Sequence, residues 1–98
     1  MTQTLLTLEA LQQAADCLKV LAHPQRLRML ELLLLNVRQT VGELAEACSI
    51  PSNIASGHLR LMLRCDILLA QRDGRYVYYR VKDPCLKKMM NCIKERFS

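Results

Sequence analysis

The chain has 98 residues, enough for one small domain, with 51% hydrophobic and 23% charged residues. This balance excludes a disordered chain, and the longest leucine run, Leu32 to Leu35, is far shorter than the roughly 18 apolar residues of a membrane span. Because the N-terminus has no basic start before an apolar stretch, we expect no signal peptide and a cytoplasmic protein. With three glycines and no tryptophan, a phosphate-binding glycine loop is not predicted.

The charge is distributed unevenly along the chain. The net charge is +5, but residues 1–59 contain 4 Lys/Arg and 5 Asp/Glu, whereas residues 60–98 contain 10 and 4. A basic half on a small domain favours a polyanion as partner. The alternative is a basic surface that is merely solvated.

The first predicted helix runs from Leu8 to Ala22 and has two apolar stripes. One stripe contains Leu8, Leu11, Ala15, Leu18 and Ala22. The other contains Ala10, Ala14, Cys17 and Leu21. A single small helix has to bury both stripes, and the second is the candidate for contact with another subunit.

Three further helices are predicted before the chain becomes β-prone. The first of these runs from Pro24 to about Leu35, with an inward face of Leu27, Leu30, Leu33 and Leu34. The pattern from Thr40 to Glu43 is a capping box, which predicts a short helix from Val41 to about Cys48. After a turn at residues 49–51, a helix is predicted from Ser52 to Arg64. The short connection between the last two is typical of a helix-turn-helix.

A β-hairpin and a last helix complete the chain. Asp73-Gly74 separates the β-prone runs 67–72 and 75–81, a strong hairpin signal, with Val77, Tyr79 and Val81 predicted to face inward. Asp83 is the predicted N-cap of a helix that has Pro84 at its first position and reaches Phe97. The order of elements predicts a mainly α protein with a β-hairpin wing, a winged helix-turn-helix that forms one domain over residues 1–98. The second apolar stripe of the first helix favours a dimeric assembly.

The helix from Ser52 has a free face suited to DNA. Small residues at its start let the backbone approach a major groove, Asn can pair with adenine, Arg can bind guanine or phosphate, and the first amides favour phosphate. Arginines of the hairpin can reach the DNA backbone. The candidate DNA contacts are Ser52, Asn53, Ser56, Gly57, His58, Arg60 and Arg64 on the helix and Arg72 and Arg75 on the wing, near Arg80. The alternatives are an ordinary polar helix face, a packing role for His58 and a charged sheet edge.

Four segments resemble the ArsR/SmtB family of bacterial winged helix-turn-helix repressors. Residues 22–33 resemble the second-helix signature of the family, and residues 41–47 resemble the first element of its helix-turn-helix. Residues 56–62 resemble the recognition helix, which in the family carries Ser-x-His-Leu, and residues 72–79 resemble the wing. The match covers about residues 15–82.

The resemblance implies a homodimer that binds a roughly palindromic operator in double-stranded DNA. Members leave the operator when a metal ion, a metalloid or an oxidant reaches the sensor, and their first and last helices build the dimer interface. Two residues depart from the family pattern: Gly57 stands where many members have a longer side chain, and Asp66 stands where a Gly usually closes the recognition helix.

The five cysteines are an odd set without a Cys-x-x-C pair, so neither a disulfide framework nor a zinc knuckle is predicted. The metal motifs of the family are incomplete: residues 43–47 lack the Cys-x-Cys of the arsenic site, residues 83–85 give only the start of a zinc motif, and Leu61 replaces one of two cysteines that sense cadmium and lead. Metal ligands therefore cannot be assigned.

Cys48 and Cys65 are expected to be buried, inert thiols. The candidate sensor thiols are Cys17, Cys85 and Cys92, on the predicted dimer helices. Cys85 and Cys92 share a helix face but lie about 10 Å apart, too far for a disulfide, so each needs Cys17 or the other subunit as partner. The predicted inducer is an oxidant, a reactive sulfur species or a thiophilic metal or metalloid ion, and no obligatory cofactor is expected.

The sequence thus predicts a sequence-specific DNA-binding repressor whose operator binding responds to cysteine thiol chemistry, and not an enzyme. Two alternatives stay open. A thiol-dependent enzyme would show turnover, and a winged-helix module that binds protein would lack the salt dependence of DNA binding.

Overall fold

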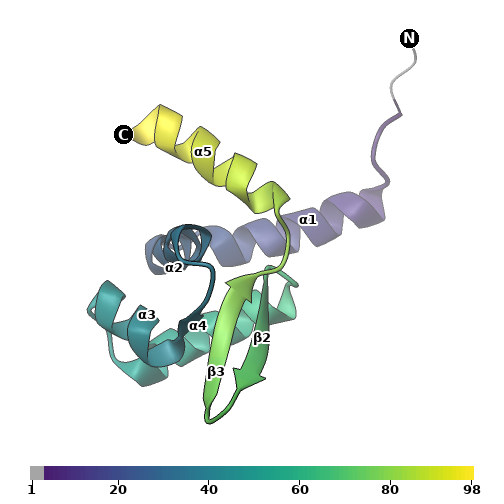
Figure 1. The fold of residues 1–98 in the computed structure, drawn as a ribbon. Coiled ribbons are helices and arrows are strands. Elements are labelled where there is room, and N and C mark those ends of the chain that lie inside the picture. Colours follow the sequence, from purple (N-terminus) through teal and green to yellow (C-terminus); the bar gives the residue numbers. More distant parts are fainter. Residues whose placement is uncertain (1–3) are drawn as a thin grey trace.

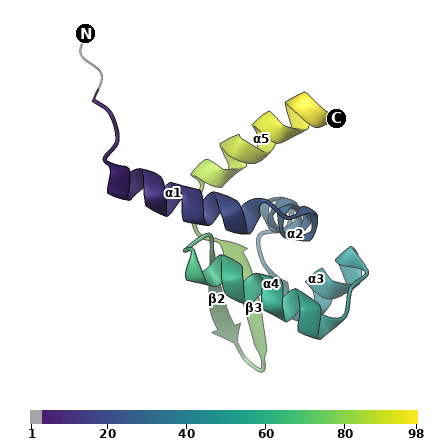
Figure 2. The same ribbon diagram turned by 180° about the vertical axis from the view of Figure 1, so that it is seen from behind.

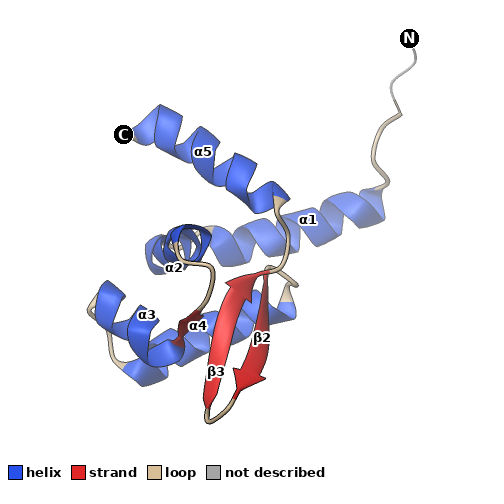
Figure 3. Cartoon of the chain, viewed as in Figure 1, coloured by secondary structure: helices blue, strands red, loops and turns tan. Residues whose placement is uncertain are grey.

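The computed structural model describes residues 4–98, and within them it contains five helices and one three-stranded antiparallel sheet (Figure 3). The elements are α1 (Leu8–Leu21), α2 (Pro24–Leu35), β1 (Gln39–Thr40), α3 (Val41–Cys48), α4 (Ser52–Arg64), β2 (Leu68–Asp73), β3 (Tyr76–Val81) and α5 (Cys85–Phe97). The predicted bounds of α2, α3 and α4 are confirmed. Residues 1–3 of the predicted domain lie outside the described residues.

Local capping explains where two of the helices begin. Nδ1 of His23 accepts a 3.1 Å hydrogen bond from the amide of Gln25, and Pro24 occupies the first position of α2. At α3 the hydroxyl of Thr40 accepts from the Glu43 amide at 3.2 Å, while the Glu43 carboxylate accepts from the Thr40 amide at 2.9 Å. The predicted capping box is therefore confirmed.

The start of α5 was predicted one residue too early. The helix begins at Cys85 with Pro84 as its N-cap, so Pro84 is not the first helical residue. The carboxylate of Asp83 still accepts a 2.9 Å hydrogen bond from the amide of Cys85. This bond satisfies one of the free amides at the start of the helix, as a side-chain cap does.

Helices α3 and α4 both end in a left-handed residue that is not glycine. Ser49 has φ 55° and Asp66 has φ 58°. The residue after each one donates back to the helix, Ile50 to the carbonyl of Ala45 at 3.0 Å and Ile67 to the carbonyl of Met62 at 3.1 Å. These bonds form a Schellman motif at the end of each helix. The motif at the end of α3 reverses the chain sharply, which allows the short turn between α3 and α4.

The sheet has the strand order β1-β3-β2. Asp73 pairs with Tyr76, so the turn of the hairpin consists of Gly74 and Arg75, one residue later than the Asp-Gly pair suggested. Gly74 has φ 65°, which a two-residue hairpin turn requires at its first central position. Strand β1 was not predicted, because two residues that pair with Tyr78 and Tyr79 leave no periodic signal in the sequence.

The hydrophobic core forms around α2. Met29, Leu30 and Leu33 of this helix are buried, as predicted for Leu30 and Leu33, whereas Leu27 and Leu34 are only half-buried at the edge of the core. Of the hairpin residues predicted to face inward, Tyr79 and Val81 pack against the core. The other buried residues come from nearly every element: Leu21, Leu44, Ala45, Ala55, Leu59, Met62, Ile67, Leu68 and Met90.

Part of the α1 stripe that was the candidate for contact with another subunit packs against the core instead. Cys17 is half-buried and Leu21 is buried, so the stripe of smaller residues faces the core of its own protomer. Leu8 and Leu18 of the leucine stripe are 84% and 56% exposed. Small side chains allow α1 to approach the rest of the domain closely, and the leucines are left on the surface.

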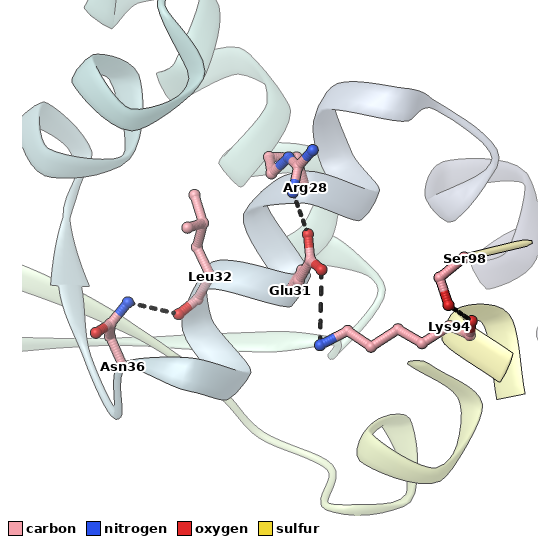
Figure 4. Close-up of polar contacts among 6 residues, drawn as sticks. All are labelled: Arg28, Glu31, Leu32, Asn36, Lys94 and Ser98. Carbon is pink, nitrogen blue, oxygen red and sulfur yellow. Dashed lines mark hydrogen bonds and ion pairs between the residues drawn. The ribbon is translucent and has the colours of Figure 1, made fainter. Parts of the chain in front are cut away.

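The domain has two ends with different elements. Figures 1 and 2 show α1 and α5 at one end, and α3, α4 and the β2–β3 hairpin at the other. Helix α5 is joined to α2 by the buried Met90 and by a 3.6 Å ion pair between Lys94 and Glu31 (Figure 4). Over residues 4–98, none of the helices combines the length and the apolar character that crossing a membrane requires.

Candidate nucleic-acid interface

Helix α4 has a core face and a polar face on opposite sides. Ala55, Leu59 and Met62 are fully buried, which fixes the rotation of the helix about its axis. With that rotation the predicted contacts on the opposite face, Asn53, Arg60 and Arg64, are exposed. The structure therefore brings an amide and two guanidinium groups together along one side of the helix.

The first turns of α4 leave room for a close partner. A Cβ atom added at Gly57 would meet nothing within 4 Å, so the backbone is open there. Ser52 is exposed and Ser56 is half-buried. The N-cap is Pro51, which offers no side-chain hydrogen bond to the first amides of the helix. Those amides are thus available to a phosphate oxygen.

His58 points toward α2 and not along the polar face of α4. Its Nδ1 accepts a 3.1 Å hydrogen bond from Nε of Arg26, and its ring lies 4.6 Å from the ring of His23. Burial lowers the pKa of His58 first, and the neighbouring His23 and Arg26 lower it further. This placement supports the packing alternative for His58 more than a DNA contact.

The wing carries exposed arginines, and one more arginine contacts it near its tip. Arg72, Arg75 and Arg80 are exposed on the hairpin. Arg38, from the segment between α2 and β1, forms a 3.0 Å ion pair with Asp73, and its guanidinium lies 3.9 Å from the centre of the Tyr78 ring. Sequence reasoning missed Arg38 because its partners lie 35 or more residues away.

The wing and α4 lie at the same end of the molecule. The hairpin runs beside α4, and its tip points away from α1 and α5 (Figures 1 and 2). The candidate contacts on the helix and on the wing therefore share one end of the domain, with His58 turned inward. This arrangement places an exposed helix of the kind that enters a DNA major groove beside a basic hairpin.

The cysteines occupy two environments. Cys85 and Cys92 are exposed on α5, as candidate sensors should be. Cys48 and Cys65 are half-buried and not buried as predicted, and burial raises the pKa of the Cys48 thiol, which Arg28 partly offsets. The thiol of Cys17 donates to the carbonyl oxygen of Cys65 at 3.4 Å.

A metal site built from several side chains is not present in the described part of the chain. Over residues 4–98, no three His, Cys, Asp or Glu residues lie close enough together to hold one ion.

Comparisons with known proteins decide the family. No protein-family model matches the chain. The chain is 30% identical over 88 residues to the transcriptional repressor PagR of Bacillus anthracis, covering 87% of this chain and 88% of PagR. It is 33% identical over 75 residues to the transcriptional repressor SmtB of Mycobacterium tuberculosis, but this match covers 76% of the chain and only 55% of SmtB. The chain thus spans about half the length of that relative.

A solved structure shows the same architecture. The winged helix-turn-helix DNA-binding domain Mb0332 of Mycobacterium bovis, described as homodimeric and as a possible ArsR-family regulator, superposes with a TM-score of 0.81 at 26% identity. The alignment covers 96% of this chain and 86% of that one. The chain belongs to the ArsR/SmtB family. Membership of the ArsR/SmtB family confirms the predicted winged helix-turn-helix fold, with α3 and α4 as the helix-turn-helix and β2–β3 as the wing.

Proposed function

We propose that the protein is a homodimeric transcriptional repressor that binds operator DNA through α4 and the wing, and that thiol chemistry on its cysteines weakens this binding. The observation that carries the proposal is the polar face of α4. Asn53, Arg60 and Arg64 are exposed there, while Ala55 and Leu59 fix the helix from behind. Side chains of these types read adenine and guanine edges in a major groove.

The wing supplies contacts that do not depend on base sequence. Arg72 and Arg75 are exposed at the end of the domain that also carries α4. Guanidinium groups in this position reach phosphates beside the groove that α4 enters, and such contacts fix the register of the protein on the duplex.

The end of the domain opposite to the wing supports dimerisation. Leu8, Leu11 and Leu18 are exposed along α1 and form an apolar surface stripe that a partner could cover. A groove of about 400 Å³ separates α2 from α5, and its lining includes Ile93 and Phe97. A second copy that covers these surfaces would leave both α4 helices free for the two halves of an operator.

The thiols are accessible to a chemical signal. Cys85 and Cys92 are exposed on α5, and Cys17 is half-buried on α1. Both helices lie at the proposed dimer end, so a modification there would change the spacing of the two α4 helices. We propose an oxidant, a reactive sulfur species or a thiophilic metal or metalloid ion as inducer, because all of these react with cysteine sulfur.

Fluorescence anisotropy tests the DNA-binding part of the proposal. The probe is a labelled duplex from the DNA upstream of the gene for this chain, titrated at several salt concentrations. The affinity should fall by orders of magnitude between about 50 and 200 mM salt. Replacing Arg60 by Ala should cost roughly 1–3 kcal/mol of binding free energy.

The matched control is Lys88→Ala, which removes a positive charge from the exposed side of α5 and should bind like the parent. Binding that is insensitive to salt and to Arg60 would instead favour a module that binds protein. For the thiol part, the affinity is measured for single Cys→Ser variants after treatment with peroxide, persulfide, arsenite or cadmium. An unchanged response in the Cys17, Cys85 and Cys92 variants would remove these residues as sensors.

A further inference from the structure

Two cysteines that are 48 residues apart in the sequence meet where α1 passes the end of α4. The thiol of Cys17 donates to the carbonyl oxygen of Cys65 at 3.4 Å, so the two residues are direct neighbours. Both residues are half-buried, so neither lies sealed inside the core. Neither the predicted sensor set nor the incomplete metal motifs joined these two residues.

The backbone on both sides of the pair is fixed. Cys65 is the C-cap of α4 and donates its amide to the carbonyl of Leu61 at 3.3 Å, and the left-handed Asp66 follows it. Cys17 lies within α1, one turn before the buried Leu21. Because hydrogen-bonded helix holds both Cα positions, a bond between the two sulfur atoms would have to form mainly by side-chain rotation.

We propose that Cys17 and Cys65 are a redox-active pair that peroxide converts into an intramolecular disulfide between α1 and the end of α4. Each thiol gives up its proton before it reacts, and the two protons end in the two water molecules. One thiolate attacks the peroxide, the O–O bond breaks, and a sulfenic acid forms as the leaving hydroxide is protonated to water. The second thiolate attacks that sulfur, the S–O bond breaks, and a second water leaves. Two sulfur atoms lose two electrons in total, and one peroxide is reduced to two water molecules.

The surroundings slow the first step of the oxidation. Burial raises the pKa of the Cys65 thiol, and the neighbouring Cys17 thiol raises it further, followed by the charges of Asp16 and Asp66. A raised pKa leaves little thiolate at neutral pH, so the reaction is slow with traces of oxidant.

The disulfide would connect the two ends of the domain, and this consequence rests on the proposed function. When the disulfide forms, the Cys17 sulfur rotates away from the Cys65 carbonyl oxygen and bonds to the Cys65 sulfur. This bond fixes α1 against the last turn of α4. If α1 holds the dimer together, the position of each α4 on the operator can then no longer adjust as the protein binds. Operator affinity should fall by roughly tenfold or more.

The chemical test uses the full chain with excess hydrogen peroxide, followed by alkylation and non-reducing peptide mass mapping. The expected product is a monomeric chain that has lost two hydrogen masses and contains a peptide linking Cys17 to Cys65. The Cys17→Ser and Cys65→Ser variants should lack this product. Cys92→Ser removes an exposed thiol from α5 and should retain it.

A disulfide through Cys85 or Cys92, or oxidation of Cys17 with Cys65 left as free thiol, would overturn the proposal. The mapping on the unaltered chain keeps the test valid if a serine variant fails to fold. For the regulatory consequence, anisotropy is measured before and after peroxide and after added dithiothreitol. The unaltered chain should lose and regain affinity, and the Cys65→Ser variant should not respond.

The experiments can refute the regulatory consequence, the proposed function and the disulfide separately. If the mapped disulfide forms without a change in affinity, the regulatory consequence is overturned. If the reduced chain shows no salt-dependent DNA binding at all, the proposed function fails, while the peptide map still decides whether the pair exists.

Discussion

Nε of Arg26 donates a hydrogen bond to Nδ1 of His58 at 3.1 Å, and this contact attaches the proposed DNA-reading helix to α2. The same guanidinium donates through another nitrogen to the carbonyl of Val20 at 3.0 Å, at the end of α1. One arginine of α2 therefore contacts α4 and the last turn of α1. The bond to His58 requires the neutral imidazole, because a protonated Nδ1 cannot accept.

This contact predicts a pH-dependent stability. Burial, His23 and Arg26 hold the pKa of His58 below its ordinary value of 6.5, so the unfolded chain takes up a proton at a higher pH than the folded chain. The stabilisation is fully present above about pH 6.5 and is lost as the pH falls through the lower pKa of the folded state. Urea unfolding at pH 7.5 and at decreasing pH should show this loss.

The variant His58→Asn is the control, since its amide oxygen accepts from Arg26 without titrating. Its free energy of unfolding should fall less steeply with decreasing pH than that of the parent. Equal slopes for the two proteins would show that His58 does not contribute to the pH dependence.

Replacing Arg38 by Ala should loosen the wing. The substitution removes the 3.0 Å ion pair with Asp73 and the guanidinium above Tyr78. Because the contact is largely solvent-exposed, the global free energy of unfolding should change by less than about 1 kcal/mol. Amide hydrogen exchange at the hairpin should become faster, while α2 exchanges as before. Arg38→Lys is the comparison, since it keeps the charge but not the planar stacking, and unchanged hairpin exchange in Arg38→Ala would argue against this role.

Removing the capping box should weaken the helix-turn-helix. In Thr40→Ala the Glu43 amide loses its acceptor at the start of α3, at a cost of about 1 kcal/mol. Thr7→Ala is the matched control, because Thr7 caps α1 with one bond to the Ala10 amide, where the first turn is exposed and can fray. Denaturant unfolding should show the larger loss for Thr40, and equal losses would contradict the reciprocal cap as the cause.

A charge in the leucine stripe should separate the proposed dimer. Leu18 is 56% exposed, so Leu18→Glu leaves the core of the protomer intact while placing a carboxylate in the apolar surface of α1. Light scattering should report the mass of a monomer. The helix content should be unchanged. Gln13→Glu, on an exposed position of the same helix away from this stripe, should remain dimeric. A dimeric Leu18→Glu chain would place the interface elsewhere.

Local chemistry made the helix-turn-helix predictable. Pro24, the box from Thr40 to Glu43 and the apolar spacing of α4 each act within a few residues, so their effects can be deduced from the sequence alone. The contact of Cys17 with Cys65 and that of Arg38 with the wing depend on how distant elements pack. The packing of part of the second α1 stripe against the core was missed for the same reason, since periodicity shows two apolar faces but not which one meets the core.

Under the proposed function, Gly57 is a position where a substitution would change the surface that α4 presents to the operator. Any side chain placed there projects into open space from the polar face of α4, and replacing a mid-helix glycine by alanine generally stabilises a helix by about 0.5–1 kcal/mol. A single substitution at Gly57 can therefore add a side chain to the polar face of α4 without destabilising the helix.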